Sequence, residues 1–252
     1  TQLCVELCNK RRFFRRQDGK DEPKMAFTVH AVMPGVWHIV DCMGVCMTLL
    51  EGENAAMLVD TGYGIEDVAD FMRHMTDLPL TVFLTHNHHD HAMGARCFPE
   101  TYMLEADMAD WRMFTNDEMR RRVLTQAIGK NLTVDEKTFL AGEIPLPKVM
   151  KPGVIDLGGL TAEIIEAPGH TPGSAVVYVP ERKLLLSGDD WNPCTWLFFP
   201  QALGLREYRS NMRGIQQLPF EKVLCPLDVR RLLQRLDGWQ PPRGGTGQYR
   251  AV

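Results

Sequence analysis

Short apolar runs dominate the chain between residues 27 and 60, and turn-forming residues separate them. The turn signals are Pro34-Gly35 and the polar stretch from Glu51 to Asn54. Short runs that are rich in β-branched residues and bounded by such turns are typical of strands. The pattern therefore predicts a meander of strands over 27–60.

Two later stretches repeat the strand pattern as hairpins. Residues 154–165 place apolar runs on both sides of Gly158-Gly159, and residues 175–187 place them on both sides of Pro180-Glu181-Arg182. Glycine pairs between apolar runs favour the tight turns of hairpins. We expect a hairpin in each stretch.

Helical spacing appears elsewhere along the chain. Residues 65–76 carry one apolar face and predict an amphipathic helix, and a further helix is expected over 205–217. Residues 104–142 lean helical, and a capping-box pattern at Thr133-Val134-Asp135-Glu136 predicts the start of a short helix. The triplet Arg120-Arg121-Arg122 fits a solvated helix face, with attraction of an anionic substrate as the alternative.

Length and composition fit one globular domain. The chain has 252 residues, of which 44% are hydrophobic and 24% are charged. We expect a charged arm over 1–24 and a single domain over 25–252, with a helical insert near 104–142. The net charge of −4 does not support nucleic acid as the main partner. No apolar run approaches the roughly 20 residues that span a bilayer.

Two further features concern partners and compartment. The basic run from Lys10 to Arg16 is interpreted as a solvated arm or a contact in a homo-oligomer, with nucleic acid or an acidic lipid surface as the alternatives. The seven cysteines form no recognisable disulfide framework. An odd number of cysteines favours a reducing compartment, so a cytoplasmic location is expected.

The densest chemical signal is Thr85-His86-Asn87-His88-His89-Asp90-His91, which follows an apolar strand pattern at 81–84. If the strand continues to about residue 88, its period of two places His86 and His88 on one face. Asp90 and His91 then lie in the following turn and can converge with them. Imidazole and carboxylate are ligands that Zn²⁺ prefers, so the stretch predicts a metal site rather than a solvated histidine-rich loop.

Three other stretches accompany this one. They are an apolar run that ends in Asp60-Thr61-Gly62, the turn Pro168-Gly169-His170-Thr171-Pro172-Gly173, and Leu184-Leu185-Leu186-Ser187-Gly188-Asp189. In order and spacing, the four stretches resemble the motifs of the metallo-β-lactamase superfamily, in particular its hydrolases of the glyoxalase II and lactonase type. The resemblance covers about residues 27 to 228.

The resemblance implies a fold and a dinuclear site. The implied fold is α/β (α+β): an αββα sandwich of two mainly antiparallel sheets flanked by helices. The implied ligands of the first metal are His86, His88 and His170. The implied ligands of the second metal are Asp90, His91 and Asp189, with Asp189 bridging both ions. Zn²⁺ is the expected cofactor at one or two ions per chain, and iron or manganese accept the same ligands.

The implied chemistry follows from these ligands. Three neutral imidazoles with an open position lower the pKa of a bound water to about 7, so a metal-bound hydroxide is the implied nucleophile. Asp90 is the expected catalytic residue, because it can hold the hydroxide's proton and pass it to the leaving group. Asp60 is implied to orient a ligand histidine. Asp190 is an alternative to Asp189 as the metal donor.

One motif departs from the resemblance. Members usually present a final histidine after a short strand, in the second metal site. The matching stretch here ends in Cys225-Pro226-Leu227-Asp228, and no histidine follows His170. Asp228 is a candidate replacement ligand, so the first site looks complete and the second depends on this position.

Aromatic residues follow the bridging aspartate. Residues 191–200 hold two tryptophans and two phenylalanines. We expect Trp191 and Trp196 to line an apolar substrate pocket and the phenylalanines to lie in the core, with packing against helix 205–217 as the alternative for the whole set.

The leading hypothesis is a metal-dependent hydrolase that acts on the carbonyl of a small ester, lactone, thioester or lactam. Its expected partner is a small-molecule substrate, with no membrane. The alternatives are a di-iron redox member of the same fold and a binding member that has lost turnover with its final histidine. Replacement of a histidine by Leu227 fits the hypothesis of a binding member.

Overall fold

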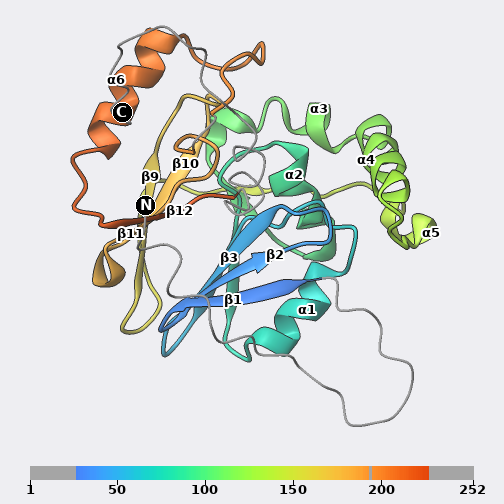
Figure 1. The fold of residues 1–252 in the computed structure, drawn as a ribbon, viewed down its shortest axis with the longest axis horizontal. Coiled ribbons are helices and arrows are strands. Elements are labelled where there is room, and N and C mark those ends of the chain that lie inside the picture. Colours follow the sequence, from blue (N-terminus) through green and yellow to red (C-terminus); the bar gives the residue numbers. More distant parts are fainter. Residues whose placement is uncertain (1–26, 193–194, 227–252) are drawn as a thin grey trace, which may run out of the picture.

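The protein is described by a computed structural model that covers residues 27–192 and 195–226. In this part of the chain, two sheets lie face to face and helices cover their outer faces (Figure 1). The αββα sandwich predicted from the sequence is confirmed. The arm at 1–24 lies outside the described residues.

The first sheet has the strand order β1-β2-β3-β4-β5-β6-β7. Its strands are β1 (Thr28–Met33), β2 (Val36–Val40), β3 (Cys46–Glu51), β4 (Ala56–Val59), β5 (Leu80–Phe83), β6 (Tyr102–Met103) and β7 (Lys148–Val149). The meander β1 to β4 is antiparallel as predicted. From β4 to β7 each pair is parallel, because helical segments return the chain to the same end of the sheet.

The second sheet has the order β12-β11-β10-β9-β8. Its strands are β8 (Gly153–Asp156), β9 (Thr161–Glu166), β10 (Ala175–Val179), β11 (Leu184–Leu186) and β12 (Lys222–Leu224). Both predicted hairpins are present as the antiparallel pairs β8–β9 and β10–β11. The pairing of β11 with β12 is parallel, so both sheets are mixed.

Helices connect and cover these strands. The α-helices are α1 (Val68–Met75), α2 (His89–Ala92), α3 (Trp111–Thr115), α4 (Asp117–Gly129), α5 (Glu136–Phe139) and α6 (Leu205–Ile215). Short 3₁₀ turns occupy η1 (Met93–Cys97), η2 (Glu105–Asp107) and η3 (Pro180–Arg182). Within the described ranges, no helix combines the length and apolar composition that crossing a membrane requires.

Alternation along the strands builds the layers. In β3, Leu50 faces the second sheet in the central cluster, whereas Leu49 packs against α1. In β10, Val177 joins the central cluster, whereas Val176 packs against α6. Because successive side chains of a strand point to opposite faces, each strand packs both against the other sheet and against a helix.

Two helix starts differ from their sequence patterns. Helix α1 begins at Val68 because Asp67 caps it by accepting the backbone N–H of Asp70. The capping box predicted to start at Thr133 is wrong, because Asp135 is the cap of α5. The carboxylate of Asp135 accepts both the backbone N–H and the hydroxyl of Thr138, at 3.2 and 2.6 Å.

The expected solvated face of the arginine triplet holds for Arg121 and Arg122 but is wrong for Arg120. Arg120 is buried and pairs with Asp117. Its guanidinium also donates to the carbonyls of Phe139, at 3.3 Å, and Gly142, at 2.7 Å. These contacts tie α4 to the end of α5, so Arg120 holds the helical insert together.

We therefore expect Arg120→Met to lower the free energy of unfolding by about 2–4 kcal/mol, because buried carbonyls lose their donors. Urea unfolding measures this change, and the exposed neighbour Arg121→Met is the control, with a shift within about 0.5 kcal/mol. Equal midpoints for the two variants would contradict this role of Arg120.

Candidate metal centre

The histidine-rich loop begins directly after β5. The strand ends at Phe83, so the expected continuation to residue 88 is wrong. Side chains take the N–H groups that a longer strand would use: Asp60 accepts from Thr85 at 2.8 Å, and Asp107 accepts from Asn87 at 3.1 Å. The loop still brings the rings of His86 and His88 together, with centroids 4.7 Å apart.

Three histidines from two loops converge. His86 and His88 follow β5, and His170 comes from the turn between β9 and β10. Each offers a nitrogen, and the three nitrogens lie within 4.8 Å of one another. Nδ1 of His88 lies 2.8 Å from Nε2 of His170. Nε2 of His86 is buried and has no hydrogen-bond partner among the described residues.

The opposite ring nitrogens of these histidines contact fixed groups. Nδ1 of His170 donates to the carbonyl of Trp196 at 2.7 Å, which leaves Nε2 with its lone pair toward the centre. Nδ1 of His86 lies 3.1 Å from the hydroxyl of Thr85, and Nε2 of His88 lies 3.2 Å from the amide of Gln201. Such contacts orient imidazoles for metal binding.

A second group lies beside the first. His91 is buried, and its Nε2 lies 3.6 Å from the carboxylate of Asp189 and 3.9 Å from that of Asp90. Ligand atoms of His86, His91 and Asp189 also lie within 4.8 Å of one another. Asp189 is 3.5 Å from Nε2 of His170, so its carboxylate reaches both groups.

Asp60 stands behind both groups. Its Oδ2 accepts from Nδ1 of His91 at 2.9 Å, and its Oδ1 accepts the hydroxyl of Thr85 at 2.9 Å. Asp60 has a positive φ of 64°, a conformation that aspartate tolerates better than most residues. This backbone turn directs the carboxylate toward the loop that carries the histidines. The contact fixes the ring of His91, and the role of Asp60 in orienting a metal ligand stays a prediction.

Asp189 and Asp190 have different surroundings. Burial alone would raise the pKa of Asp189, but His91 and His170 outweigh that effect and hold it at about 2. Burial raises the pKa of Asp190 to about 8, although it accepts the backbone N–H of His170 at 2.9 Å. Asp189 therefore faces the histidines as a carboxylate, while Asp190 supports the loop of His170.

Burial sets the charge of the imidazoles. Burial and neighbouring histidines lower the pKa of His86, and they lower that of His88 to about 2. Burial also lowers the pKa of His170. Burial would lower the pKa of His91 too, but the carboxylates of Asp60 and Asp189 outweigh it and raise that pKa. The trio is thus held in the neutral form that binds metals.

Asp107 joins the two histidine loops and was missed by the sequence analysis. This buried carboxylate accepts the N–H of Asn87 at 3.1 Å, the hydroxyl of Thr171 at 2.8 Å and the N–H of Gly173 at 2.6 Å. Its position in the helical insert, outside every motif, gave no signal. The contacts fix the loop of His86 and His88 relative to the loop of His170.

The aromatic residues after Asp189 differ from the expectation. Trp191 packs on Phe220, with centroids 5.6 Å apart, in the cluster beneath α6. This packing is the arrangement expected under the alternative, and a place for Trp191 in the substrate pocket stays a prediction. Trp196 is 51% exposed, and its place in a substrate pocket stays a prediction. The core placement of both phenylalanines is wrong, because Phe198 is exposed and Phe199 lies against His88.

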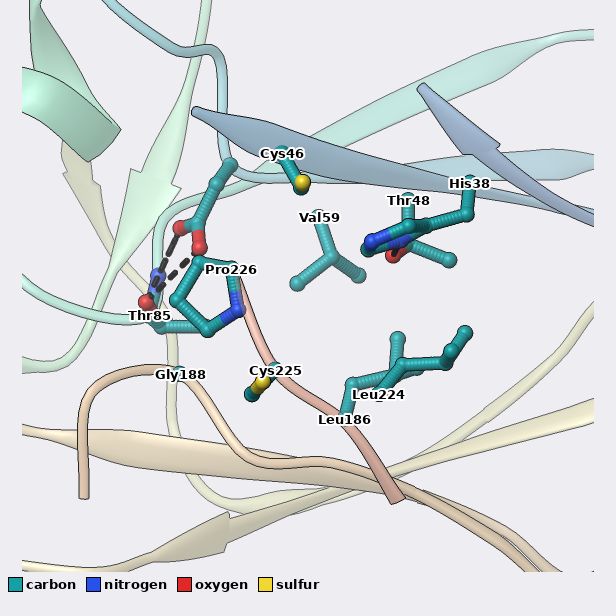
Figure 2. Close-up of a pocket in the computed structure, with 11 residues that line it drawn as sticks. His38, Cys46, Thr48, Val59, Thr85, Leu186, Gly188, Leu224, Cys225 and Pro226 are labelled. Atoms are coloured by element: carbon teal, nitrogen blue, oxygen red, sulfur yellow. Dashed lines mark hydrogen bonds between the residues drawn. The ribbon is translucent and has the colours of Figure 1, made fainter. Parts of the chain in front are cut away.

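The final motif approaches the site from β12. Cys225 and Pro226 line a cavity of about 10 Å³ together with Asp60 and Thr85 (Figure 2). The carbonyl of Pro226 accepts the N–H of Cys46 at 2.9 Å, which joins the two sheets here. Leu227 and Asp228 lie outside the described residues, so the possible ligand Asp228 stays a prediction.

The family model of the metallo-β-lactamase superfamily matches residues 40–190, which include all these histidines. The chain belongs to this superfamily. The predicted resemblance is thereby confirmed. Members of the superfamily are mostly metal-dependent hydrolases with small-molecule substrates.

Curated relatives are distant. The acyl-coenzyme A thioesterase MBLAC2 of Gallus gallus is 26% identical over 168 residues, which cover 59% of each chain. The linear primary-alkylsulfatase of a Pseudomonas strain is 23% identical over 56% of this chain and 32% of its own length. The match thus spans about three-fifths of the thioesterase and a third of the sulfatase.

Solved structures share the fold. A metallo-beta-lactamase from Pontibacter korlensis aligns with a TM-score of 0.57 at 17% identity, covering 84% of this chain and all of that one. The protein TTHA1623, solved in a di-iron-bound form, aligns with a TM-score of 0.51 at 21% identity, over 72% of this chain and 86% of that one. At these identities the likeness concerns the fold alone.

The donor set fits a divalent metal. Neutral imidazoles and a carboxylate converge, and the buried Nε2 of His86 lacks any other partner in the described part of the chain. Leaving such a buried polar atom unpaired costs free energy unless a ligand satisfies it. His86, His88 and His170 are the candidate first site, and Asp189 with His91 is the candidate second site.

We expect Asp107→Asn to weaken zinc binding about 10–100-fold, because the amide places donors against donors and loosens both histidine loops. Calorimetric titration of metal-free protein measures the affinity, and the exposed Asp77→Asn is the control. Thermal unfolding of the metal-free variants separates this effect from a general loss of stability. An unchanged zinc affinity would show that Asp107 does not position the histidines for metal binding.

Proposed function

We propose that this chain is a metal-dependent hydrolase of small carbonyl substrates, of the ester, lactone, thioester or lactam class, with zinc as its metal. The observation that carries the proposal is the convergence of three neutral imidazole nitrogens beside Asp189, with Asp90 3.9 Å from the neighbouring His91. A bound divalent metal supplies Lewis acidity and makes water acidic enough to act as a nucleophile near neutral pH.

The chain's own residues supply orientation and proton transfer. Thr85, Gln201 and the carbonyl of Trp196 fix the three imidazoles. Asp90 is a partly exposed carboxylate 3.9 Å from Nε2 of His91, in a position to accept a proton from the attacking water. The water oxygen bonds to the carbonyl carbon, and the bond to the leaving group breaks. Asp90 then returns the proton to that leaving group.

Within this substrate class, a thioester is favoured. The supporting fact is that the curated relative from Gallus gallus is named as an acyl-coenzyme A thioesterase. The match covers 59% of that relative's length, so its activity enters here only as part of the proposal.

A redox function with two iron ions is the second candidate. The same imidazole and carboxylate donors suit iron, and one structural neighbour was solved in a di-iron-bound form. An absorption band from iron in the purified protein favours this candidate, and a colourless zinc protein favours the hydrolase.

We expect zinc-loaded protein to hydrolyse members of a panel of esters, lactones, thioesters and lactams, and chelation to abolish this activity reversibly. Asp90→Asn should lower kcat about 10²–10⁴-fold because the proton acceptor is lost. His74→Ala, an exposed histidine on α1, is the control. Elemental analysis verifies that each sample holds metal. A loaded wild type that is inactive across the panel rules out the proposal.

The final motif has its own test. If residue 227 takes the place of the family's last histidine, Leu227→His should tighten binding of a second zinc ion, since it adds an imidazole donor. Zinc titration of the metal-free variant and wild type measures the change, with Leu227→Ala as the control for loss of the leucine. Equal second-site affinities would show that the sequence alignment at 227 is wrong.

A further inference from the structure

Four aromatic side chains connect the candidate metal centre with the protein surface, and the innermost of them, Phe114, is buried. We define this aromatic wall as Phe114, Trp196, Phe198 and Phe199. The rings of Phe114 and Phe199 lie 4.4 and 4.9 Å from that of His88. Phe198 lies 4.9 Å from Phe199, and Trp196 lies 5.2 Å from Phe198. The wall therefore runs outward from a candidate ligand to the protein surface.

Contacts with the site hold the wall in place. The carbonyl of Trp196 accepts from His170 at 2.7 Å, and Gln201 contacts His88. The N–H of Leu203 donates to the carbonyl of Gly169 at 2.8 Å, next to His170. The residues that position the histidines thus also position the wall, so their geometries depend on each other.

The outer part of the wall is uncovered. Phe198 is 69% exposed and Trp196 is 51% exposed. Two large aromatic rings in contact with each other at the surface form an apolar patch, and such patches mark binding sites when they adjoin a functional centre. Because the inner rings contact His88, a molecule that extends along Phe198 and Phe199 reaches the candidate metal centre.

The other end of the site is polar. His86 lies between the wall and this end, since its ring is 4.7 Å from His88 and 4.2 Å from His91. Beyond His91 lie Asp90 and then His89, whose ring contacts Tyr63 at 5.6 Å. Asp90, the carboxylate proposed to return a proton to the leaving group, thus lies beside His91, whereas the wall contacts His88 and, at 5.9 Å, His170.

We propose that the aromatic wall binds the apolar chain of the substrate's acyl group, so that the leaving group lies on the Asp90 side. The inference rests on the proposed hydrolase function and assigns the two parts of its substrate to the two ends of the site. A substrate bound this way extends its chain along Phe199 and Phe198 while its carbonyl lies at the histidines.

Binding of reaction products tests the wall without turnover. Straight-chain alkanoates from acetate to octanoate are titrated calorimetrically into zinc-loaded and metal-free protein. The affinity of the zinc-loaded protein is expected to rise about two- to fourfold per added methylene, since each buried methylene contributes up to about 0.8 kcal/mol. Phe198→Ala should reduce this increment, and Val154→Ala, which alters an exposed apolar residue on β8, should leave it unchanged.

Kinetics test the orientation. In one thioester series the acyl group lengthens while the thiol stays constant, and in the other the thiol lengthens while the acyl group stays acetyl. The ratio kcat/KM should rise with acyl length only, and Phe198→Ala should lose more activity as the acyl chain lengthens. A rise with thiol length alone would overturn the assignment of the two ends.

The outcomes separate the two proposals. One outcome is hydrolysis that does not depend on acyl length, together with alkanoate affinities that do not change with length. This outcome would overturn the proposal that the aromatic wall binds the acyl chain, and it would leave the hydrolase function intact. Length-dependent alkanoate binding that Phe198→Ala weakens, in a protein with no turnover, would support the wall as an apolar binding surface and overturn the hydrolase function.

Discussion

Buried aspartates behind the histidines are the constraint on which the metal centre depends. The loops that carry the histidines have left the strand ladders, so their N–H groups need other acceptors. Asp60 accepts from Thr85, Asp107 accepts from both loops, and Asp190 accepts from His170. Each of these aspartates is buried and therefore fixes a loop that would otherwise hold unpaired donors.

The sandwich brings these loops to one edge. The first sheet delivers His86 and His88 at the end of β5, and the second delivers His170 between β9 and β10 and Asp189 after β11. The central cluster between the sheets holds these strand ends in register with each other. Burial then keeps the imidazoles of His86, His88 and His170 neutral beside the carboxylate of Asp189. Local hydrogen bonds hold the aromatic wall against them.

Sequence patterns predicted the strands, the two hairpins and the histidines that converge, because period and motif spacing are local properties. They did not predict where β5 ends, since the acceptors that stop it, Asp60 and Asp107, lie far along the chain. The burial of Arg120 and the packing of Trp191 on Phe220 are likewise set by tertiary contacts. The contact of Phe114 with His88 is also a tertiary contact, so the sequence pattern did not predict it.

The central claim is that His86, His88 and His170 together bind a divalent metal. Elemental analysis of the protein, purified with neither chelator nor added metal, tests it most directly when His86→Ala is analysed in parallel. The account predicts at least one zinc per folded wild-type chain and a clear loss in the variant, because the buried Nε2 donor is gone. A folded wild type that contains no metal and takes up none on titration would contradict it.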